Sequence, residues 1–166
     1  MSLLPPPADT LVPAWQGFVA IWFGSGLVEP LRACLAVTIA AILVIGLSRK
    51  QRLIVPMIGI AAVILGVFVS TEIGAASGVK DDRRIVIDEV AAFILGAAFL
   101  RGFHWVASAV FGAVFLLLDR IKPWPFHLLE ELPSGWGVMA DDLGLGIVLG
   151  AVLLALLSIE RKFRHA

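Results

Sequence analysis

Residues 118–142 have the sequence LDRIKPWPFHLLEELPSGWGVMADD and lie between two long apolar runs. The stretch begins with Asp119 at the end of one predicted helix, and Pro123 and Pro125 then interrupt the backbone. It closes with a predicted glycine turn at 135–137 and the adjacent acids Asp141 and Asp142, which precede the next apolar run. Because most of the chain is hydrocarbon, charges at these places are costly and indicate a functional site.

The composition of the chain is typical of a membrane protein. Of its 166 residues, 60% are hydrophobic and 16% are charged, and the mean hydropathy is +0.98. A soluble domain typically has about 45–50% apolar and about 25% charged residues. The formal net charge is zero, so the composition gives no argument for a nucleic-acid partner. The single cysteine, Cys34, excludes a disulfide within the chain.

Five apolar runs predict an all-α polytopic membrane bundle with about five membrane-embedded helices. The runs cover residues 33–48, 53–70, 85–100, 103–118 and 143–159. Before them, Trp15 and Trp22 bracket a run that is too short to cross a bilayer, which predicts a short N-terminal helix at the membrane surface or at the bundle edge. We divide the chain into an extended lead-in at 1–14, one membrane domain at 15–160 and a basic tail at 161–166.

The acids near the helix ends are expected to share one membrane face. If successive helices cross in opposite directions, the beginnings of the third and fifth helices meet the end of the fourth. These ends carry the five acids Asp88, Glu89, Asp119, Asp141 and Asp142. The opposite face has basic residues and almost no acids. We therefore place the function at the acidic face.

Each charged residue also has a purely structural explanation. Asp141 or Asp142 could be an N-cap, and Asp88 and Glu89 could be first-turn acids that stabilise their helix. Lys122 could simply neutralise Asp119. The glycines at 135–137 could serve only a turn. Independent caps need not gather on one face, however, so these explanations are weaker together than a common site.

The pattern favours hydrolysis of a phosphate ester at the membrane surface. Mg²⁺ prefers oxygen ligands such as carboxylates, water and phosphate oxygens. It neutralises phosphate charge and can activate a water as the nucleophile, and an aspartate nucleophile is the other route that the sequence leaves open. Lys122 would contact the transferring phosphoryl group, and backbone N–H groups at Gly135 and Gly137 would approach the anion.

The sequence resembles the phosphatidylglycerophosphatase A family. Five blocks follow the family's order across about residues 23–150: GSGL at 24–27, GVKD at 78–81, IVIDE at 85–89, Asp119 followed by KPWP at 122–125, and GWGVMADD at 135–142. The resemblance implies an all-helical fold. It also implies Mg²⁺-dependent removal of the terminal phosphate from phosphatidylglycerophosphate, which gives phosphatidylglycerol.

The resemblance implies roles for individual residues. The expected metal ligands are Asp88, Glu89, Asp119, Asp141 and Asp142, and the expected catalytic residues are Asp119, Lys122 and Asp142. The expected substrate contacts are Gly24, Ser25, Gly26, Arg32, Asp81, Arg120, Lys122, Gly135 and Gly137. The chain departs from the family at residues 29–34, which replace a Pro-Gly-Thr turn, and at Leu116, which replaces an arginine. Arg32 or Arg120 would compensate for these losses.

The resemblance also implies a location. Because the family's lipid substrate is made on the cytoplasmic leaflet, we expect a multi-pass protein of the bacterial inner membrane with its acidic face in the cytoplasm. The expected partners are phosphatidylglycerophosphate or a similar lipid phosphate, and membrane lipids; whether the chain forms a homo-oligomer stays open.

Two alternatives remain. One is a diverged membrane phosphatase that acts on another lipid phosphate. The other is a non-enzymatic multipass protein that binds or transports a cation through its acids. Against the second alternative, no acid lies in the middle of a predicted span, and no clear internal repeat is present.

Overall fold

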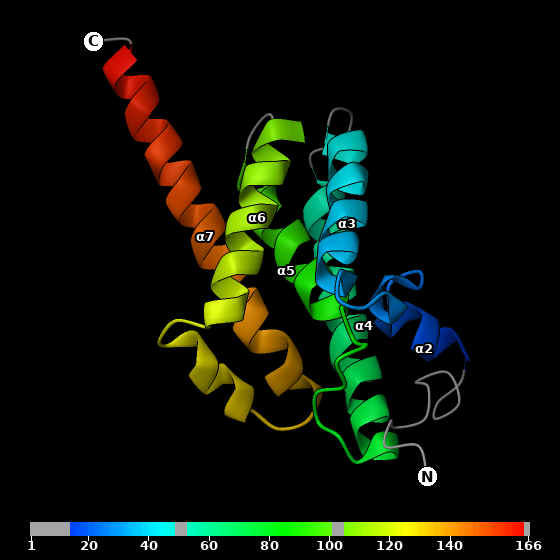
Figure 1. The fold of residues 1–166 in the computed structure, drawn as a ribbon. Helices are drawn as coiled ribbons and strands as arrows, with labels where there is room; N and C mark the ends of the chain where they lie inside the picture. The colour runs from blue at the N-terminus through cyan, green and yellow to red at the C-terminus, as the bar shows by residue number, and fades with distance from the viewer. Residues whose placement is uncertain (1–13, 49–52, 101–104, 165–166) are drawn as a thin grey trace.

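A computed structural model describes residues 14–48, 53–100 and 105–164 of the chain. All regular structure in these residues is helical (Figure 1), which confirms the all-α prediction. In chain order the elements are α2 (Ala14–Ala20), the 3₁₀ helix η1 (Ser25–Leu27), α3 (Arg32–Ser48), α4 (Ile54–Ser77), α5 (Ile87–Ala98), α6 (Trp105–Ile121), the 3₁₀ helix η2 (Phe126–Glu131) and α7 (Gly135–Arg164).

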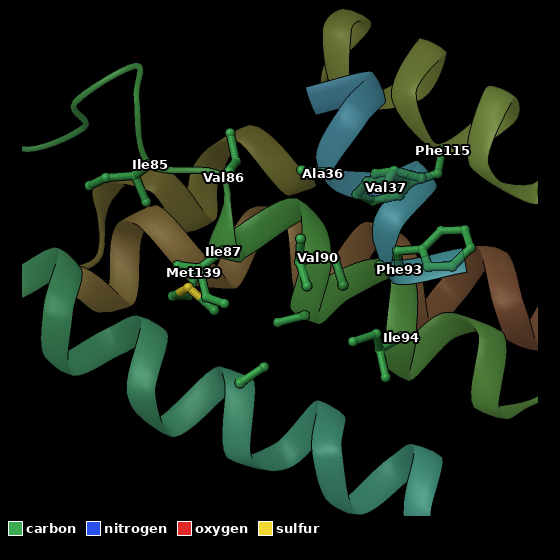
Figure 2. Packing of buried hydrophobic residues seen from close by; sticks show 14 of the residues in the cluster. Ala36, Val37, Ile85, Val86, Ile87, Val90, Phe93, Ile94, Phe115 and Met139 are labelled. Carbon is green, nitrogen blue, oxygen red and sulfur yellow. The ribbon is translucent and has the colours of Figure 1, made fainter. Parts of the chain in front are cut away.

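Helix α5 lies at the centre of the bundle and packs against α3, α4 and α7. Residues 90–94 of this helix are fully buried. Figure 2 shows Val90, Phe93 and Ile94 within a cluster that includes Phe115 from α6 and Val37 from α3. A helix that is apolar on all sides is stable only where other elements cover it, so the sequence of α5 accounts for its central place.

Glycines bring α5 and α7 into close contact. A Cβ atom built on Gly146 would lie 2.5 Å from the backbone oxygen of Ala92, and one built on Gly150 would lie 2.4 Å from that of Gly96. No side chain fits at such distances, so the two backbones approach closely only because these positions lack one. We call Gly96, Gly146 and Gly150 the glycine seam. It fixes the spacing between the two helices that carry most of the predicted acids.

The helix ends that carry the acids gather at one end of the bundle, as the sequence predicts. In Figure 1 the beginnings of α3, α5 and α7 and the ends of α4 and α6 lie in the lower half, together with η2. The opposite end holds the ends of α3 and α5 and the beginning of α6. Residues 49–52 and 101–104, which carry four of the basic residues expected at the opposite face, lie outside the described residues.

Two helices in the described part of the chain are long and apolar enough to cross a membrane, namely α4 and residues Gly135–Glu160 of α7. Helix α3 is apolar but shorter. The 12 residues of α5 extend about 18 Å, less than the roughly 30 Å of a hydrocarbon core. The helix begins at Ile87, and the N–H of its N-cap residue Val86 donates to the carbonyl of Ala20 at 3.0 Å. The prediction of five membrane helices is therefore confirmed only in part.

The predicted glycine turn at 135–137 is wrong, because these residues form the first turn of α7. Gly135 packs directly on α4, where a Cβ atom would lie 2.1 Å from the backbone oxygen of Val67. Its N–H donates to the hydroxyl of Thr71 at 3.0 Å. This packing overrides the low helix propensity of glycine. The predicted start of the fifth helix at residue 143 is wrong for the same reason.

The predicted N-terminal helix forms as α2 and packs against α4. The rings of Trp15 and Phe68 stack with their centroids 6.2 Å apart, and Gln16 and Ala20 are buried. This places α2 at the bundle edge, which was one of the two predicted locations. Residues 1–13 of the lead-in predicted at 1–14 lie outside the described residues, and Ala14 is already the first residue of α2. The expected tail boundary after residue 160 falls inside α7. The domain limits stay predictions.

Candidate active site

Three acids meet where α5 and α7 approach each other. Asp88 and Glu89 lie in the first turn of α5, and Asp142 lies in α7. Each contributes one carboxylate oxygen to a group whose atoms all lie within 4.8 Å of one another. Glu89 is 9% exposed and Asp142 is 4% exposed. We call these three residues the acid trio.

Asp88 and Glu89 lie in the first turn of α5, as the structural alternative expects, but none of the acids forms a helix-capping hydrogen bond among the described residues. Helix α5 has Val86 at its N-cap position and no side-chain cap hydrogen bond. Asp142 stands in the second turn of α7 rather than at its beginning. Among the described residues, Asp88 Oδ1, Glu89 Oε2 and Asp141 Oδ1 are buried and accept no hydrogen bond. Buried carboxylate oxygens without partners are costly, so these atoms require another explanation.

The acid trio has the donor chemistry of a magnesium site. Mg²⁺ takes oxygen ligands and is commonly held by a small number of carboxylates. The unpartnered oxygens of Asp88 and Glu89 supply such ligands, and a bound cation would also offset the repulsion among three neighbouring carboxylates. The residues present therefore fit the ion that the sequence analysis expects.

Asp119 extends this acidic region from a third helix. It lies in the last turn of α6, as predicted, and comes close enough to interact electrostatically with Glu89 and Asp142. Its negative charge opposes the helix dipole at that end, so the position is unfavourable for α6 alone. Four of the five predicted metal ligands are thus neighbours, and Asp141 has a different partner.

Lys122 pairs with Asp141 rather than with Asp119. Its Nζ lies 2.6 Å from Asp141 Oδ2 and also donates to the carboxylate of Glu130. Burial lowers the pKa of Lys122, but these two hydrogen bonds raise it more, so the pKa lies above its usual value and the amine keeps its proton. The simple explanation that Lys122 neutralises its neighbour Asp119 is therefore wrong.

The backbone of Lys122 is also unusual. Its φ of 44° places it in the left-handed region directly after α6. Glycine normally occupies this position, because the left-handed conformation destabilises a residue with a Cβ atom by about 1–2 kcal/mol. Such strain persists where the surrounding structure holds a side chain in a required place. Here it directs the amine toward the acids of α7.

Lys80 and Lys122 line one cavity of about 150 Å³. Its walls are formed by Lys80, Asp81, Asp88, Lys122, Glu130, Gly137, Val138 and Asp141. Lys80 donates through Nζ to the backbone oxygen of Glu130. The cavity therefore joins one member of the acid trio to two amines, which is a combination suited to an anion bound beside a cation.

The sequence analysis missed Lys80 and Glu130 as site residues. The two lie 50 positions apart in the chain, and no local pattern connects them. Gly137, by contrast, was predicted as a substrate contact. It lines the cavity, and its N–H donates to the carbonyl of Ser134 at 3.2 Å. A Cβ atom there would lie 2.3 Å from the oxygen of Leu132 and 2.6 Å from Nζ of Lys80, so only glycine leaves room for the amine.

Several predicted substrate contacts do not line this cavity. A Cβ atom on Gly26 would lie 2.1 Å from the backbone oxygen of Arg84, so η1 packs on the loop before α5. The hydroxyl of Ser25 donates to the carbonyl of Trp22 at 2.9 Å. Arg32 is paired with Glu29 by a salt bridge, and Arg120 is exposed. Roles for Gly24, Ser25, Gly26, Arg32 and Arg120 in substrate binding stay predictions.

Comparison with known proteins identifies the family. The family model described as phosphatidylglycerophosphatase A matches residues 18–157. A phosphatidylglycerophosphatase A from Haemophilus influenzae is 31% identical over 144 residues, which cover 83% of this chain and 86% of the relative. One from Escherichia coli (strain K12) is 31% identical over 142 residues, which cover 81% and 79%. No solved structure matches the chain significantly.

The family model spans every helix that contributes to the cavity and the acid trio. Both relatives share more than three quarters of their length with the chain, so the similarity is not confined to a fragment. The chain belongs to the phosphatidylglycerophosphatase A family and is a phosphatase.

Proposed function

We propose that this phosphatase hydrolyses the terminal phosphomonoester of phosphatidylglycerophosphate to give phosphatidylglycerol, with Mg²⁺ as its cofactor. The names of the family and of both relatives support the substrate. The observation that carries the proposal is the acid trio, in which one oxygen each of Asp88 and Glu89 is buried without a partner and which adjoins a cavity lined by two lysines. A phosphate group and a cation are complementary to these two parts.

In this proposal Asp88, Glu89 and Asp142 hold the ion, and Asp119 and Asp141 complete the acidic surroundings. Bound Mg²⁺ would supply the positive charge that neutralises the phosphate oxygens during transfer. Asp119 and Asp142 keep the catalytic roles that the sequence analysis gives them. Their position at the end of the bundle allows a phosphate to approach from the aqueous side while the lipid remains in the membrane.

The lysines would bind the phosphate by exchanging partners. In the structure Lys122 is paired with Asp141 and Glu130, and Lys80 is bonded to a backbone oxygen of η2. An entering phosphate monoester carries more negative charge than either carboxylate and presents more acceptor oxygens. Lys122 would therefore turn from Glu130 to the phosphate and hold the transferring group as a fixed positive charge.

Phosphate release from purified protein tests the activity. We expect release from phosphatidylglycerophosphate in detergent micelles, its loss on chelation, and its recovery on addition of Mg²⁺. Phosphatidic acid in a parallel reaction tests the alternative of another lipid phosphate. Release that persists unchanged after chelation would remove Mg²⁺ from the proposal. Cation flux in vesicles without any phosphate release would favour the transport alternative.

We also propose that the chain crosses the bacterial inner membrane five times with its acidic end in the cytoplasm. The common location of the relevant helix ends supports this arrangement (Figure 1). Single cysteines at Ser134→Cys and Lys162→Cys in a Cys34→Ser background provide the test, since both original side chains are exposed at opposite ends of α7. In intact cells a membrane-impermeant thiol reagent should label only the Lys162→Cys protein. Labelling of only the Ser134→Cys protein would reverse the orientation.

A further inference from the structure

An apolar groove of about 430 Å³ runs between α3 and α6, outside the cavity described above. Trp105, Ala109, Ala113 and Leu116 of α6 line one side, and Cys34 and Ile45 of α3 belong to the other. The two helices lie side by side in Figure 1. Leu116 is the residue that replaces an arginine of the family pattern, and it faces this groove rather than the cavity.

The groove is hollow because small residues alternate with large ones along α6. Ala109, Gly112 and Ala113 line it, whereas Phe111 and Phe115 are fully buried in the core on the other side of the helix. A Cβ atom on Gly112 would lie 3.1 Å from Val37 of α3, so the helices are close at that level. The groove therefore lies along a closely packed pair of helices, and α3 and α6 are not separated from each other beneath it.

The groove leads toward the acidic site. Asp119 follows Leu116 by three residues, which places both on one face of α6 about one turn apart. Asp119 in turn neighbours Glu89 and Asp142. From Leu116 to Trp105 the helix rises about 16 Å, close to half of the roughly 30 Å hydrocarbon core of a bilayer. The groove thus begins beside the acids and extends over the depth of one lipid leaflet.

We propose that this groove binds one acyl chain of the lipid phosphate whose headgroup occupies the acidic site. The inference rests on the proposed function, because it assumes a lipid substrate. An acyl chain matches the lining, which is almost entirely apolar, and the length, which is that of one leaflet. A chain held beside α6 fixes the headgroup at the end of the same helix, so the groove positions the scissile phosphate and selects lipids with long chains.

Filling the groove tests the proposal. Ala109→Phe and Ala113→Phe add a ring at exposed positions that line it, so the fold should tolerate them. Val110→Phe and Val114→Phe are matched controls, because these neighbours on α6 are also exposed but do not line the groove. Phosphate release is measured with dipalmitoyl and dibutyryl phosphatidylglycerophosphate in the same detergent.

We expect the two groove variants to lower kcat/KM for the dipalmitoyl lipid by about tenfold or more, equivalent to about 1.4 kcal/mol, through a higher KM. Their kcat/KM for the dibutyryl lipid should stay within about twofold of the unmodified protein, as should both values for the controls. Equal losses on both lipids, or losses no larger than those of the controls, would contradict the proposal. A second copy of the chain docked in the groove would give equal losses together with a change in oligomeric state.

Labelling of Cys34 provides a readout that needs no catalysis. This residue lines the groove, is exposed and is the single cysteine of the sequence. Dipalmitoyl phosphatidylglycerol should slow its alkylation by N-ethylmaleimide, and dibutyryl phosphatidylglycerol should not. Equal alkylation rates with both lipids would refute the acyl-chain site even if the enzyme is active. Protection together with absent phosphate release would instead mean that the proposed function has failed.

Discussion

Two groups of buried acids lie close together in this protein, and they differ in how their oxygens are satisfied. Asp82 is 4% exposed and accepts hydrogen bonds from the backbone N–H and the guanidinium of Arg84, with Nε at 2.8 Å. The acid trio begins six residues further along the chain, at Asp88. Within the described residues it forms no salt bridge, and one oxygen each of Asp88 and Glu89 is buried without a partner. Asp82 and the acid trio are thus both buried, but only Asp82 is paired directly with a cationic side chain.

The difference separates structure from function. Asp82 and Arg84 close the loop before α5, and the carbonyl of Arg84 in turn supports Gly26 of η1. The acid trio has no such partner, and its carboxylates repel one another. This contrast agrees with a structural role for Asp82 and with the proposal that the acid trio holds a cation.

The largest expected effect comes from neutralising one member of the acid trio. Asp142→Asn should lower kcat by more than about 100-fold, because it removes a proposed ligand of the cation that would compensate the phosphate charge. The melting temperature should stay the same or rise, since one source of repulsion is lost. Activity assays and thermal denaturation of the same preparation give both values. An activity within tenfold of the unmodified protein would exclude Asp142 from the site.

Removal of the paired lysine should have the next largest effect. Lys122→Ala should lower kcat/KM by about 100-fold, and Lys80→Ala should lower it less. Lys122 approaches two acids from a strained backbone position, whereas Lys80 contacts a single backbone oxygen. Phosphate release measured over a range of substrate concentrations checks this order. Similar losses for the two variants would show that the cavity uses both amines alike.

Replacement of Asp82, the acid paired with Arg84, should lower stability and leave activity nearly unchanged. Asp82→Asn weakens charged hydrogen bonds to Arg84 and should lower the free energy of unfolding by about 1.5–3 kcal/mol. The specific activity of the protein that remains folded should be nearly unchanged. Arg83→Gln is the matched control, because Arg83 is exposed in the same loop. A large loss of kcat without a loss of stability would move Asp82 into the catalytic group.

The smallest expected effect is the pH dependence of the stability that Asp82 contributes to the fold. The hydrogen bonds from Arg84 lower the pKa of Asp82 below its ordinary value of 3.8. Its stabilising contribution is therefore fully present above pH 3.8 and is lost as the pH falls through the lowered pKa. The stability gap between the unmodified protein and Asp82→Asn should be constant from pH 7 to about pH 5 and shrink below 3.8. A gap that shrinks between pH 7 and pH 5 would contradict this assignment.

The arrangement of the helices was predictable because apolar runs and terminal charges are local signals. Their alternation correctly placed Asp88, Glu89, Asp119 and Asp142 at one end of the bundle. The sequence did not predict that Asp141 and Asp142 would have different partners. Adjacent residues on a helix point about 100° apart, and here one faces Lys122 while the other faces α5. Which of the two faces a given neighbour depends on the packing of α7.

Contacts between distant segments account for what the sequence did not reveal. The first turn of α7 is helical because Gly135 fits against α4, although glycine locally favours a turn. Glu130 joins the site only because η2 brings it to Lys122 and Lys80. Neither contact leaves a periodic signal in the chain. The sequence thus predicted the grouping of the acids but not the contacts of Lys80 and Glu130, and the functional roles of all these residues stay predictions.

The glycine seam has a consequence for the choice of ion. Gly146 follows Asp142 by one helical turn, and its contact Ala92 follows Asp88 by one turn. The distance between the acids is therefore set by uncharged positions deeper in the bundle. Mg²⁺ requires ligands at about 2.0–2.1 Å, whereas Ca²⁺ accepts about 2.3–2.6 Å. One added methyl group at Gly146 would clash with the backbone of Ala92, so this position controls the distance between Asp88 and Asp142 without touching either acid.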